Sequence, residues 1–301
     1  MSDETAIRSA LAAWQFHAPI RIERLLGGFN SRTWRVYCGT EQFVAKLVPN
    51  TATFEAGLIV AEQLERAGFS AGGPLRTRQG ALTVRLADQS LALLRFVRGE
   101  PIDPARTGDL RIWGETMAQI HLLQQQAPSI PEGLPRWPWT WLDPTAPYLD
   151  IEPWTRPTIE RALEEVRELE ATRPLTLGIL HGDGASVLVD ITTGARAVID
   201  WGAAMWGPLL YDVASARWLF QFKDRHDPRD FAPFLEAYQR RAPLPAEELG
   251  ALDIFVRLRC AVQAFYFAWR IADDIRIGLA DPAENRRRLD DAHKAWEQLD
   301  Q

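Results

Sequence analysis

Residues 180–190 read LHGDGASVLVD, and residues 197–202 read AVIDWG. Each segment combines a short apolar strand with a polar cluster that contains an aspartate, Asp183 in the first and Asp200 in the second. The turn Thr192-Thr193-Gly194 separates them. Two strands and a turn return the chain beside itself, so this spacing predicts that the two carboxylates lie near each other.

The composition is that of an ordinary globular protein, with 301 residues, 47% hydrophobic and 25% charged. This length is sufficient for two modest lobes. A net charge of −6 provides no basic surface for nucleic acid or an anionic membrane, although it would suit a cationic substrate. No run approaches the roughly 18 apolar residues of a membrane helix. The acidic start does not resemble a signal peptide, so we expect a cytoplasmic protein.

Two cysteines, Cys38 and Cys260, lie far apart and form no C-x-x-C pair. The sequence therefore indicates neither a disulfide framework nor a zinc site. Nothing in the composition predicts the oligomeric state.

The hydrophobic period changes close to residue 97. Before this point, residues 20–26, 33–38, 42–48, 82–86 and 91–97 are predicted as strands, and residues 4–16 and 54–67 as helices. After it, helices are predicted at residues 109–124, 159–170, 209–220, 231–241 and 252–277. We therefore expect an α+β protein with a β-rich lobe at residues 1–97, containing one key helix, and a mainly helical lobe at residues 98–301.

The two aspartate segments resemble the H-G-D-x-x-x-x-N and I-D-W motifs of the aminoglycoside phosphotransferase and choline kinase family, the small-molecule relatives of protein kinases. The resemblance extends from about Arg21 to Leu289. It implies a two-lobed, protein-kinase-like fold with nucleotide in the first lobe and catalysis and substrate binding in the second. It also implies transfer of the γ-phosphate of ATP, with Mg²⁺, to a hydroxyl of a small molecule such as an aminoglycoside, an amino alcohol or a sugar.

The resemblance assigns roles to the two aspartates. Asp183 would accept the proton of the substrate hydroxyl, and Asp200 would be a carboxylate ligand for Mg²⁺. The asparagine of the family pattern is absent, because Leu188 occupies its place. If the loop is two residues shorter, Ser186 takes that place and offers a weaker magnesium ligand.

Three alternatives follow from the missing asparagine. Ser186 substitutes for it, a water molecule fills the gap, or the metal site is impaired. In the last case the chain would be a nucleotide-binding pseudoenzyme or a regulatory relative.

The first lobe contains two candidate phosphate-binding features. Gly27, Gly28, Asn30 and Ser31 form a turn between strands, where the backbone and polar side chains can approach phosphates. A plain β-turn is the alternative interpretation. Lys46 lies in mid-strand among apolar neighbours, so its ammonium must reach solvent or meet an anion.

The resemblance implies that Lys46 binds phosphate and that a helix glutamate positions it. Glu55 matches this glutamate better than Glu62, although both can be solvated helix charges. The last strand of the first lobe would be the hinge, where the backbone of Arg95 and Val97 binds the adenine edge. The alternative is an ordinary edge strand.

The remaining candidates lie in the second lobe. His181 would brace the loop by hydrogen bonding, Asp212 would have a structural role, and His121 would be a core histidine. An aromatic box for a cationic amine is one interpretation of the Pro- and Trp-rich segment, and pinning of that segment to the core is the other. The residues concerned are Trp137, Trp139, Trp141, Tyr148 and Trp154, with Asp143 and Asp273 or Asp274 as acids.

Overall fold

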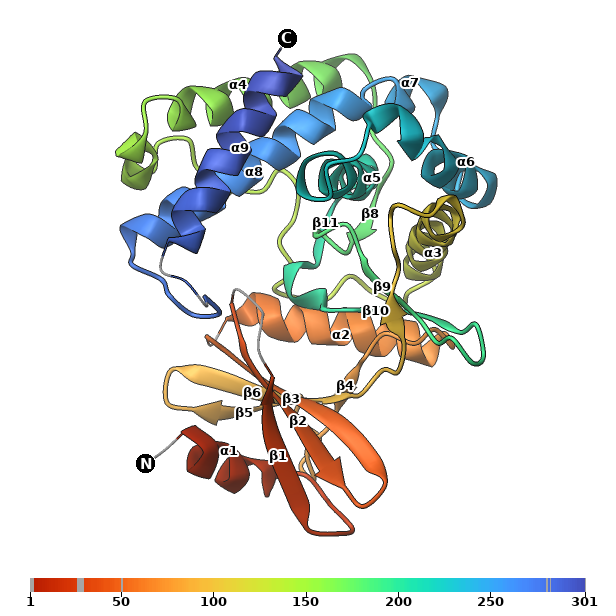
Figure 1. The fold of residues 1–301 in the computed structure, drawn as a ribbon, viewed down its shortest axis with the longest axis vertical. Helices are drawn as coiled ribbons and strands as arrows, with labels where there is room; N and C mark the ends of the chain where they lie inside the picture. Colours follow the sequence, from red (N-terminus) through yellow and green to blue (C-terminus); the bar gives the residue numbers. More distant parts are fainter. Residues whose placement is uncertain (1–2, 26–29, 50, 280, 282, 301) are drawn as a thin grey trace.

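The computed structural model describes residues 3–25, 30–49, 51–279, 281 and 283–300. Its N-terminal lobe is a six-stranded antiparallel sheet in the order β1-β2-β3-β6-β4, and β5 also pairs with β6. Figure 1 shows this sheet below the helical lobe, with one helix lying between them. The elements of this lobe are α1 (Asp3–Leu11), β1 (Ile20–Leu25), β2 (Arg32–Cys38), β3 (Glu41–Pro49), α2 (Ala52–Arg66), β4 (Pro74–Leu75), β5 (Thr83–Leu86) and β6 (Gln89–Arg95).

Side-chain alternation along β3 separates the two faces of this sheet. Ala45 and Leu47 pack with α1 on one face, whereas Val48 packs with α2 on the other. Successive residues of a strand point to opposite faces. Lys46, which lies between Ala45 and Leu47, is therefore directed toward the α2 side, where the second lobe begins.

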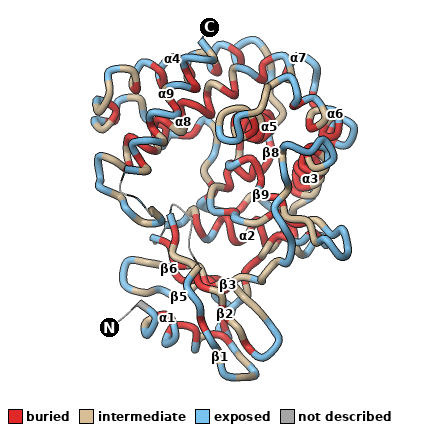
Figure 2. The backbone as a smooth tube through the Cα atoms, in the orientation of Figure 1, coloured by how far each residue is buried: buried red, intermediate tan, exposed pale blue. Residues whose placement is uncertain are grey.

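The second lobe is built around α8, which packs against α4, α5 and α9. Figure 2 shows that buried positions concentrate in α8, α5 and α3. The α8 sequence repeats large apolar residues at helical spacing, which explains its central position. The helices are α3 (Thr107–Gln125), α4 (Thr155–Thr172), α5 (Leu210–Trp218), α6 (Ala232–Arg241), α7 (Ala246–Leu249), α8 (Leu252–Ala272) and α9 (Glu284–Leu299).

Short strands between these helices frame the two aspartate segments. β11 pairs with β8, and β9 pairs with both β10 and β7. In the β9–β10 hairpin Ile199 lies opposite Ser186, so Ser186 is at the same end of the hairpin as Asp200. The strands are β7 (Glu100–Pro101), β8 (Leu177–Leu180), β9 (Ser186–Val189), β10 (Arg196–Ile199) and β11 (Met205–Pro208).

The predicted two-lobed α+β architecture is confirmed, with corrections at helix ends. The helix predicted at residues 252–277 ends at Ala272, before a turn in which Asp274 has a φ of 48°. The helix predicted at residues 4–16 ends at Leu11. Helix α9 was not predicted, because it is highly charged and its apolar stripe is narrow. In the described part of the chain, no helix has both the length and the apolar character of a membrane span.

Helix α2 contacts the second lobe through a glycine. A Cβ atom at Gly57 would lie 2.2 Å from the carbonyl oxygen of Trp201, in the short helix η2 (Trp201–Ala203). The absence of a side chain at Gly57 therefore permits close packing of α2 on the segment that follows Asp200.

This packing predicts different effects for two glycine substitutions. Gly57→Ala should lower the free energy of unfolding by about 1–3 kcal/mol, because the new methyl group meets backbone that cannot move aside easily. Gly108→Ala, in the first turn of α3 with open space around it, should be neutral or stabilising by up to about 1 kcal/mol. Urea unfolding of both variants measures the difference, and equal effects would contradict the proposed packing.

Candidate active site

The loop between β8 and β9 is tightly bent. Gly182, Gly184 and Ala185 all have positive φ, at 87°, 76° and 63°. A Cβ atom at Gly182 would lie 2.1 Å from the carbonyl oxygen of Ala203. The indole N–H of Trp113 donates to the carbonyl of Gly184 at 2.7 Å. The short loop is therefore fixed against the core on both sides of Asp183.

A buried carboxylate, that of Asp212 in α5, holds the start of this loop. It accepts hydrogen bonds from the backbone N–H groups of His181 (2.6 Å) and Gly182 (2.8 Å) and from Nε2 of His121 (3.1 Å). Burial acts to raise the pKa of Asp212, but the hydrogen bond and charge of His121, together with His181, outweigh it and hold this pKa below its usual value. The structural role expected for Asp212 is confirmed.

The imidazole of His181 connects the two aspartate segments. Its Nδ1 atom accepts a hydrogen bond from the N–H of Ala185 at 3.3 Å, and its Nε2 atom lies 3.0 Å from the carbonyl oxygen of Ile199. A nitrogen that accepts carries no proton, so the hydrogen is on Nε2 and is donated to Ile199. His181 thus braces the loop, as the sequence predicted.

Asp183 is held by an arginine that the sequence analysis missed. Nη2 of Arg259 donates to Oδ1 of Asp183 at 3.0 Å, while Nη1 donates to the carbonyl of Gly182 at 3.2 Å and lies 3.4 Å from the Tyr211 hydroxyl. Arg259 is buried, whereas 54% of the Asp183 side chain is exposed. Within the described residues no hydrogen bond engages Oδ2 of Asp183, which leaves that oxygen for a ligand.

A signal for Arg259 was present in the sequence. It interrupts the apolar face of the predicted core helix, between Leu258 and Cys260. A buried arginine is costly unless it is paired, so this position indicated an internal acidic partner. Sequence alone did not identify that partner as Asp183, because the two residues are 76 positions apart.

Lys46 and Asp200 form an ion pair between the lobes. Nζ of Lys46 lies 2.5 Å from Oδ1 of Asp200, with 13% and 55% of the side chains exposed. Partial burial acts to raise the pKa of Asp200, but the adjacent Lys46 ammonium outweighs it and keeps the pKa below its usual value. Asp200 has a φ of 70°, so its backbone conformation is uncommon for a residue with a side chain.

The donor set beside this ion pair suits a hard cation. The Asp200 carboxylate and the exposed Ser186 hydroxyl both offer oxygen, the element that Mg²⁺ prefers, and the remaining positions can be filled by phosphate and water. No group of three or more His, Cys, Asp or Glu side chains that could hold a metal occurs among the residues that the structure describes. A metal here would therefore depend on the phosphates of a bound nucleotide.

The expected contact between Lys46 and Glu55 is corrected by the structure. The Glu55 carboxylate instead lies 2.5 Å from the hydroxyl of Thr83, on β5. Glu62 is also engaged elsewhere, at 2.8 Å from Arg76. Asp200 takes the ammonium because the strand directs Lys46 toward the second lobe, while the first turn of α2 places Glu55 beside β5. A nucleotide-binding role for Glu55 stays a prediction.

Part of the expected hinge is already occupied. The N–H of Arg95 donates to the carbonyl of Gly73 at 2.9 Å, and its side chain forms an ion pair with Glu65. The N–H of Arg95 is therefore engaged within the N-terminal lobe, and adenine binding by its backbone carbonyl stays a prediction. Val97 has no backbone hydrogen bond in the described part of the chain, and its adenine-binding role stays a prediction.

The predicted phosphate-binding turn is only partly visible. Gly27 and Gly28 lie outside the described residues. Ser31 is buried, and Asn30 is exposed with its amide oxygen in contact with α8. Their roles toward phosphate remain predictions.

Four of the five aromatic residues of the tryptophan-rich connection are linked by ring contacts. Trp137 packs on Trp139 and Trp139 on Trp141, and both Trp141 and Tyr148 pack on Phe265. Trp139 is buried and donates its indole N–H to the carbonyl of Trp206 at 3.1 Å. Trp137 donates to Glu170, and Trp154 stacks on His293 with ring centroids 4.3 Å apart. These contacts support the interpretation that the tryptophans pin the connection to the core.

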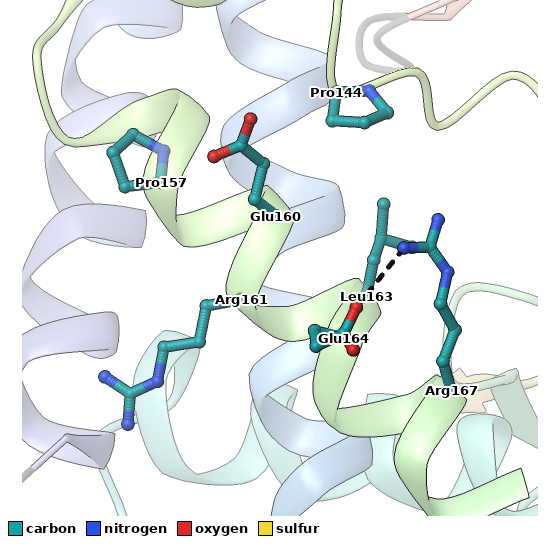
Figure 3. Close-up of a pocket in the computed structure, with 7 residues that line it drawn as sticks. All are labelled: Pro144, Pro157, Glu160, Arg161, Leu163, Glu164 and Arg167. Carbon is teal, nitrogen blue, oxygen red and sulfur yellow. Dashed lines mark hydrogen bonds and ion pairs between the residues drawn. The ribbon is translucent and has the colours of Figure 1, made fainter. Parts of the chain in front are cut away.

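One surface hollow lies away from this constellation. Figure 3 shows it beside α4, where Glu160, Arg161, Glu164 and Arg167 line it together with apolar neighbours. None of its lining residues contributes to the loop or to the Lys46–Asp200 pair. The hollow therefore carries no part of the site described above.

The geometry and fold are those of a kinase-like phosphotransferase, and comparisons with known proteins agree. A model of the phosphotransferase enzyme family matches residues 21–250, so the chain belongs to this family. The resemblance inferred from the sequence is thereby confirmed. Small-molecule phosphotransfer is the activity class of this family.

Individual relatives share only a small part of their sequence with this chain. Homoserine kinase of Rhizobium etli (strain CIAT 652) is 27% identical over 243 residues, covering 76% of this chain and 74% of that protein. An amicoumacin kinase structure, in complex with AMP-PNP, Ca²⁺ and its ligand, has a TM-score of 0.76 at 12% identity, with 99% and 94% of the chains covered. A choline/ethanolamine kinase family protein from Mesorhizobium loti has a TM-score of 0.67 at 18% identity, with 99% and 94% covered.

The buried Asp212 predicts a pH-dependent loss of stability. Asp212→Asn should lower the free energy of unfolding at pH 7 by about 3–5 kcal/mol, because it removes one partner from a buried charged cluster. The folded-state pKa of Asp212 is lowered, so its contribution is complete above the unfolded value of about 4 and is lost as the pH falls through the folded value. Denaturant unfolding should show that the difference in free energy of unfolding between Asp212→Asn and the wild type becomes smaller as the pH falls from 7 to 3.

The control for this measurement is Asp88→Asn, in the exposed turn between β5 and β6. It should leave stability nearly unchanged at both pH values. An Asp212→Asn deficit that is the same at pH 7 and pH 3 would show that the charge of Asp212 does not contribute.

Proposed function

We propose that this protein transfers the γ-phosphate of ATP to a hydroxyl group of a small molecule. The observation that carries the proposal is the state of Asp183, which has one carboxylate oxygen fixed by Arg259 and the other without a hydrogen bond in the described chain. A carboxylate held in this way can accept a proton from a bound hydroxyl. The hydroxyl oxygen then bonds to the γ-phosphorus as the bond to the ADP oxygen breaks.

The neighbouring ion pair supplies the charges for this reaction. Lys46 is available to bind phosphate oxygens, and nucleotide binding would replace its contact with Asp200. Asp200 and Ser186 would hold Mg²⁺, which would neutralise charge on the phosphates. Protein charges and fixed dipoles are the main catalytic contribution in phosphoryl transfer, since the protein does little covalent chemistry.

The proposed binding and catalytic roles are divided between the two lobes. We place nucleotide binding in residues 1–97 and catalysis with acceptor binding in residues 98–301. The relatives named homoserine kinase make a hydroxy amino acid a first candidate acceptor, and the structural neighbours add antibiotics and amino alcohols. Each of these compounds offers the hydroxyl that the proposed reaction requires.

Asp183→Asn tests the proposed reaction. The variant should lower kcat by about 10²–10⁴-fold because the amide cannot accept the proton, while ATP affinity stays near that of the wild type. ADP release should be measured with homoserine, aminoglycosides, amino alcohols and sugars as acceptors, and ATP binding by calorimetry. Asp190→Asn is the matched control, since Asp190 lies in the same segment and only caps the turn at residues 192–193.

The outcomes separate the two functions left open by the missing asparagine. An undiminished rate in Asp183→Asn would contradict the assignment of Asp183. Binding of ATP that depends on Mg²⁺, without turnover of any acceptor, would favour the nucleotide-binding pseudoenzyme. Absence of ATP binding would exclude both.

Ser186→Ala tests the metal site. Loss of the hydroxyl should raise the Mg²⁺ concentration for half-maximal activity by roughly tenfold, because one oxygen near the cation disappears. Activity should be titrated with Mg²⁺ at saturating ATP, after chelator treatment has abolished it. The control is Ser9→Ala, on the exposed side of α1, and identical Mg²⁺ curves for both variants would exclude Ser186 as a ligand.

A further inference from the structure

Two hydrogen-bond donors of the helical lobe converge on one oxygen of the nucleotide lobe. The hydroxyl of Tyr266 lies 2.7 Å from Oδ1 of Asn30, and Nη1 of Arg270 lies 2.9 Å from the same atom. Nη1 of Arg270 also lies 3.1 Å from the Tyr266 hydroxyl. The three groups thus form a compact cluster in which a single oxygen receives two donors.

The arginine donor of this cluster is held in place by several other hydrogen bonds. Arg270 has no exposed surface, and its guanidinium is fixed by Asn285 of α9 at 2.9 Å and by the carbonyls of Ile275 and Ile277. Asn30, in contrast, is exposed. The donors are therefore preorganised, whereas the oxygen that they bind belongs to a residue that an incoming ligand can reach.

The cluster lies on the same face of α8 as the arginine that holds Asp183. Tyr266 and Arg270 follow Arg259 by seven and eleven residues, and both intervals return to nearly the same side of a helix with 3.6 residues per turn. Burial raises the pKa of Tyr266, although the charge of Arg270 and the hydrogen bonds to Arg270 and Asn30 act to lower it. One face of α8 therefore leads from the proposed catalytic carboxylate to this cluster.

We propose that Tyr266 and Arg270 form the oxyanion-binding end of the acceptor site, and that Oδ1 of Asn30 occupies the position taken by a carboxylate oxygen of the acceptor. This inference rests on the proposed function and specifies its substrate class as a hydroxy acid. An ionised carboxylate is a stronger partner for a guanidinium than a neutral amide oxygen, so it can displace Asn30. The acceptor then presents its hydroxyl toward Asp183 and its carboxylate toward Arg270.

A phosphate of the nucleotide has the same oxyanion chemistry as a carboxylate. The placement of both donors on α8, in the lobe that contains Asp183, favours the acceptor. The two possible ligands predict different results. Loss of a donor would weaken acceptor binding if the cluster binds the carboxylate of the acceptor, and nucleotide binding if it binds a phosphate.

The test compares two acceptors that differ only at the acid group. L-homoserine carries the carboxylate, and 2-amino-1,4-butanediol replaces it with a hydroxymethyl group. Calorimetric titrations should use the full chain, with and without Mg²⁺ and a non-hydrolysable ATP analogue. The wild type should bind L-homoserine about tenfold or more tightly than the diol, because a hydrogen-bonded charge is lost in the latter.

The variant Tyr266→Phe should weaken L-homoserine binding about tenfold, leaving the affinities for the diol and the ATP analogue unchanged. Tyr37→Phe is the matched control, since its hydroxyl contacts Glu23 on the outer strands of the sheet. Asn30→Ala should strengthen L-homoserine binding measured without nucleotide, because it removes the group that the carboxylate must displace. ADP release with the same acceptors shows whether Tyr266→Phe changes KM for L-homoserine, as a binding role predicts, or kcat.

Several results would overturn the inference. Equal binding of the two acceptors, or no binding of L-homoserine by the wild type, would show that no carboxylate site exists. Weaker binding of the ATP analogue in Tyr266→Phe, with L-homoserine unaffected, would assign the cluster to a nucleotide phosphate. Turnover of acceptors without a carboxylate, with L-homoserine neither bound nor phosphorylated, would overturn the inference and leave the proposed function intact.

Discussion

The loop between β8 and β9 depends on one buried carboxylate, that of Asp212. Two consecutive backbone N–H groups, of His181 and Gly182, have no helix or strand to pair with where the chain leaves β8, and both donate to this carboxylate. Leaving such groups unsatisfied in the interior is costly. His121 provides the third contact, so the carboxylate is stabilised as an anion despite its burial. The direction of the loop, and hence of Asp183, follows from these bonds.

The lobes meet through contacts of three different kinds. Gly57 lets α2 approach the backbone of Trp201, Lys46 forms an ion pair with Asp200, and Asn30 accepts hydrogen bonds from α8. The first contact is steric and does not depend on ligands. The other two involve groups that a nucleotide and an oxyanion can engage instead. The lobes are thus joined by close packing at Gly57, by hydrogen bonds such as that from the N–H of Val198 to the carbonyl of Ser70, and by side-chain contacts at the proposed site.

The sequence predicted those features that depend on local pattern. Strand alternation placed Lys46 among apolar neighbours, and the polar clusters beside short strands marked Asp183 and Asp200. The partners of these residues depend on tertiary packing, which local pattern does not contain. Local pattern therefore gave no sign that Arg259 approaches Asp183, from a helix far along the chain. The pairing of Lys46 with Glu55, which the family resemblance implied, is replaced in the structure by the pair with Asp200. The kinase-like fold was predictable because its motifs are specific, whereas contacts between distant elements were not.

The course of the loop between β8 and β9 is explained by what surrounds it. Its carbonyl at Gly184 is bonded to Trp113, and its positive φ at Ala185 turns the chain directly into β9, opposite β10. Ser186 therefore lies at the end of the hairpin that precedes Asp200, opposite Ile199. A serine hydroxyl is shorter than an asparagine amide and is a weaker ligand. The loop thus places the Ser186 hydroxyl at the Asp200 end of the hairpin, while Arg259, from α8, holds Asp183.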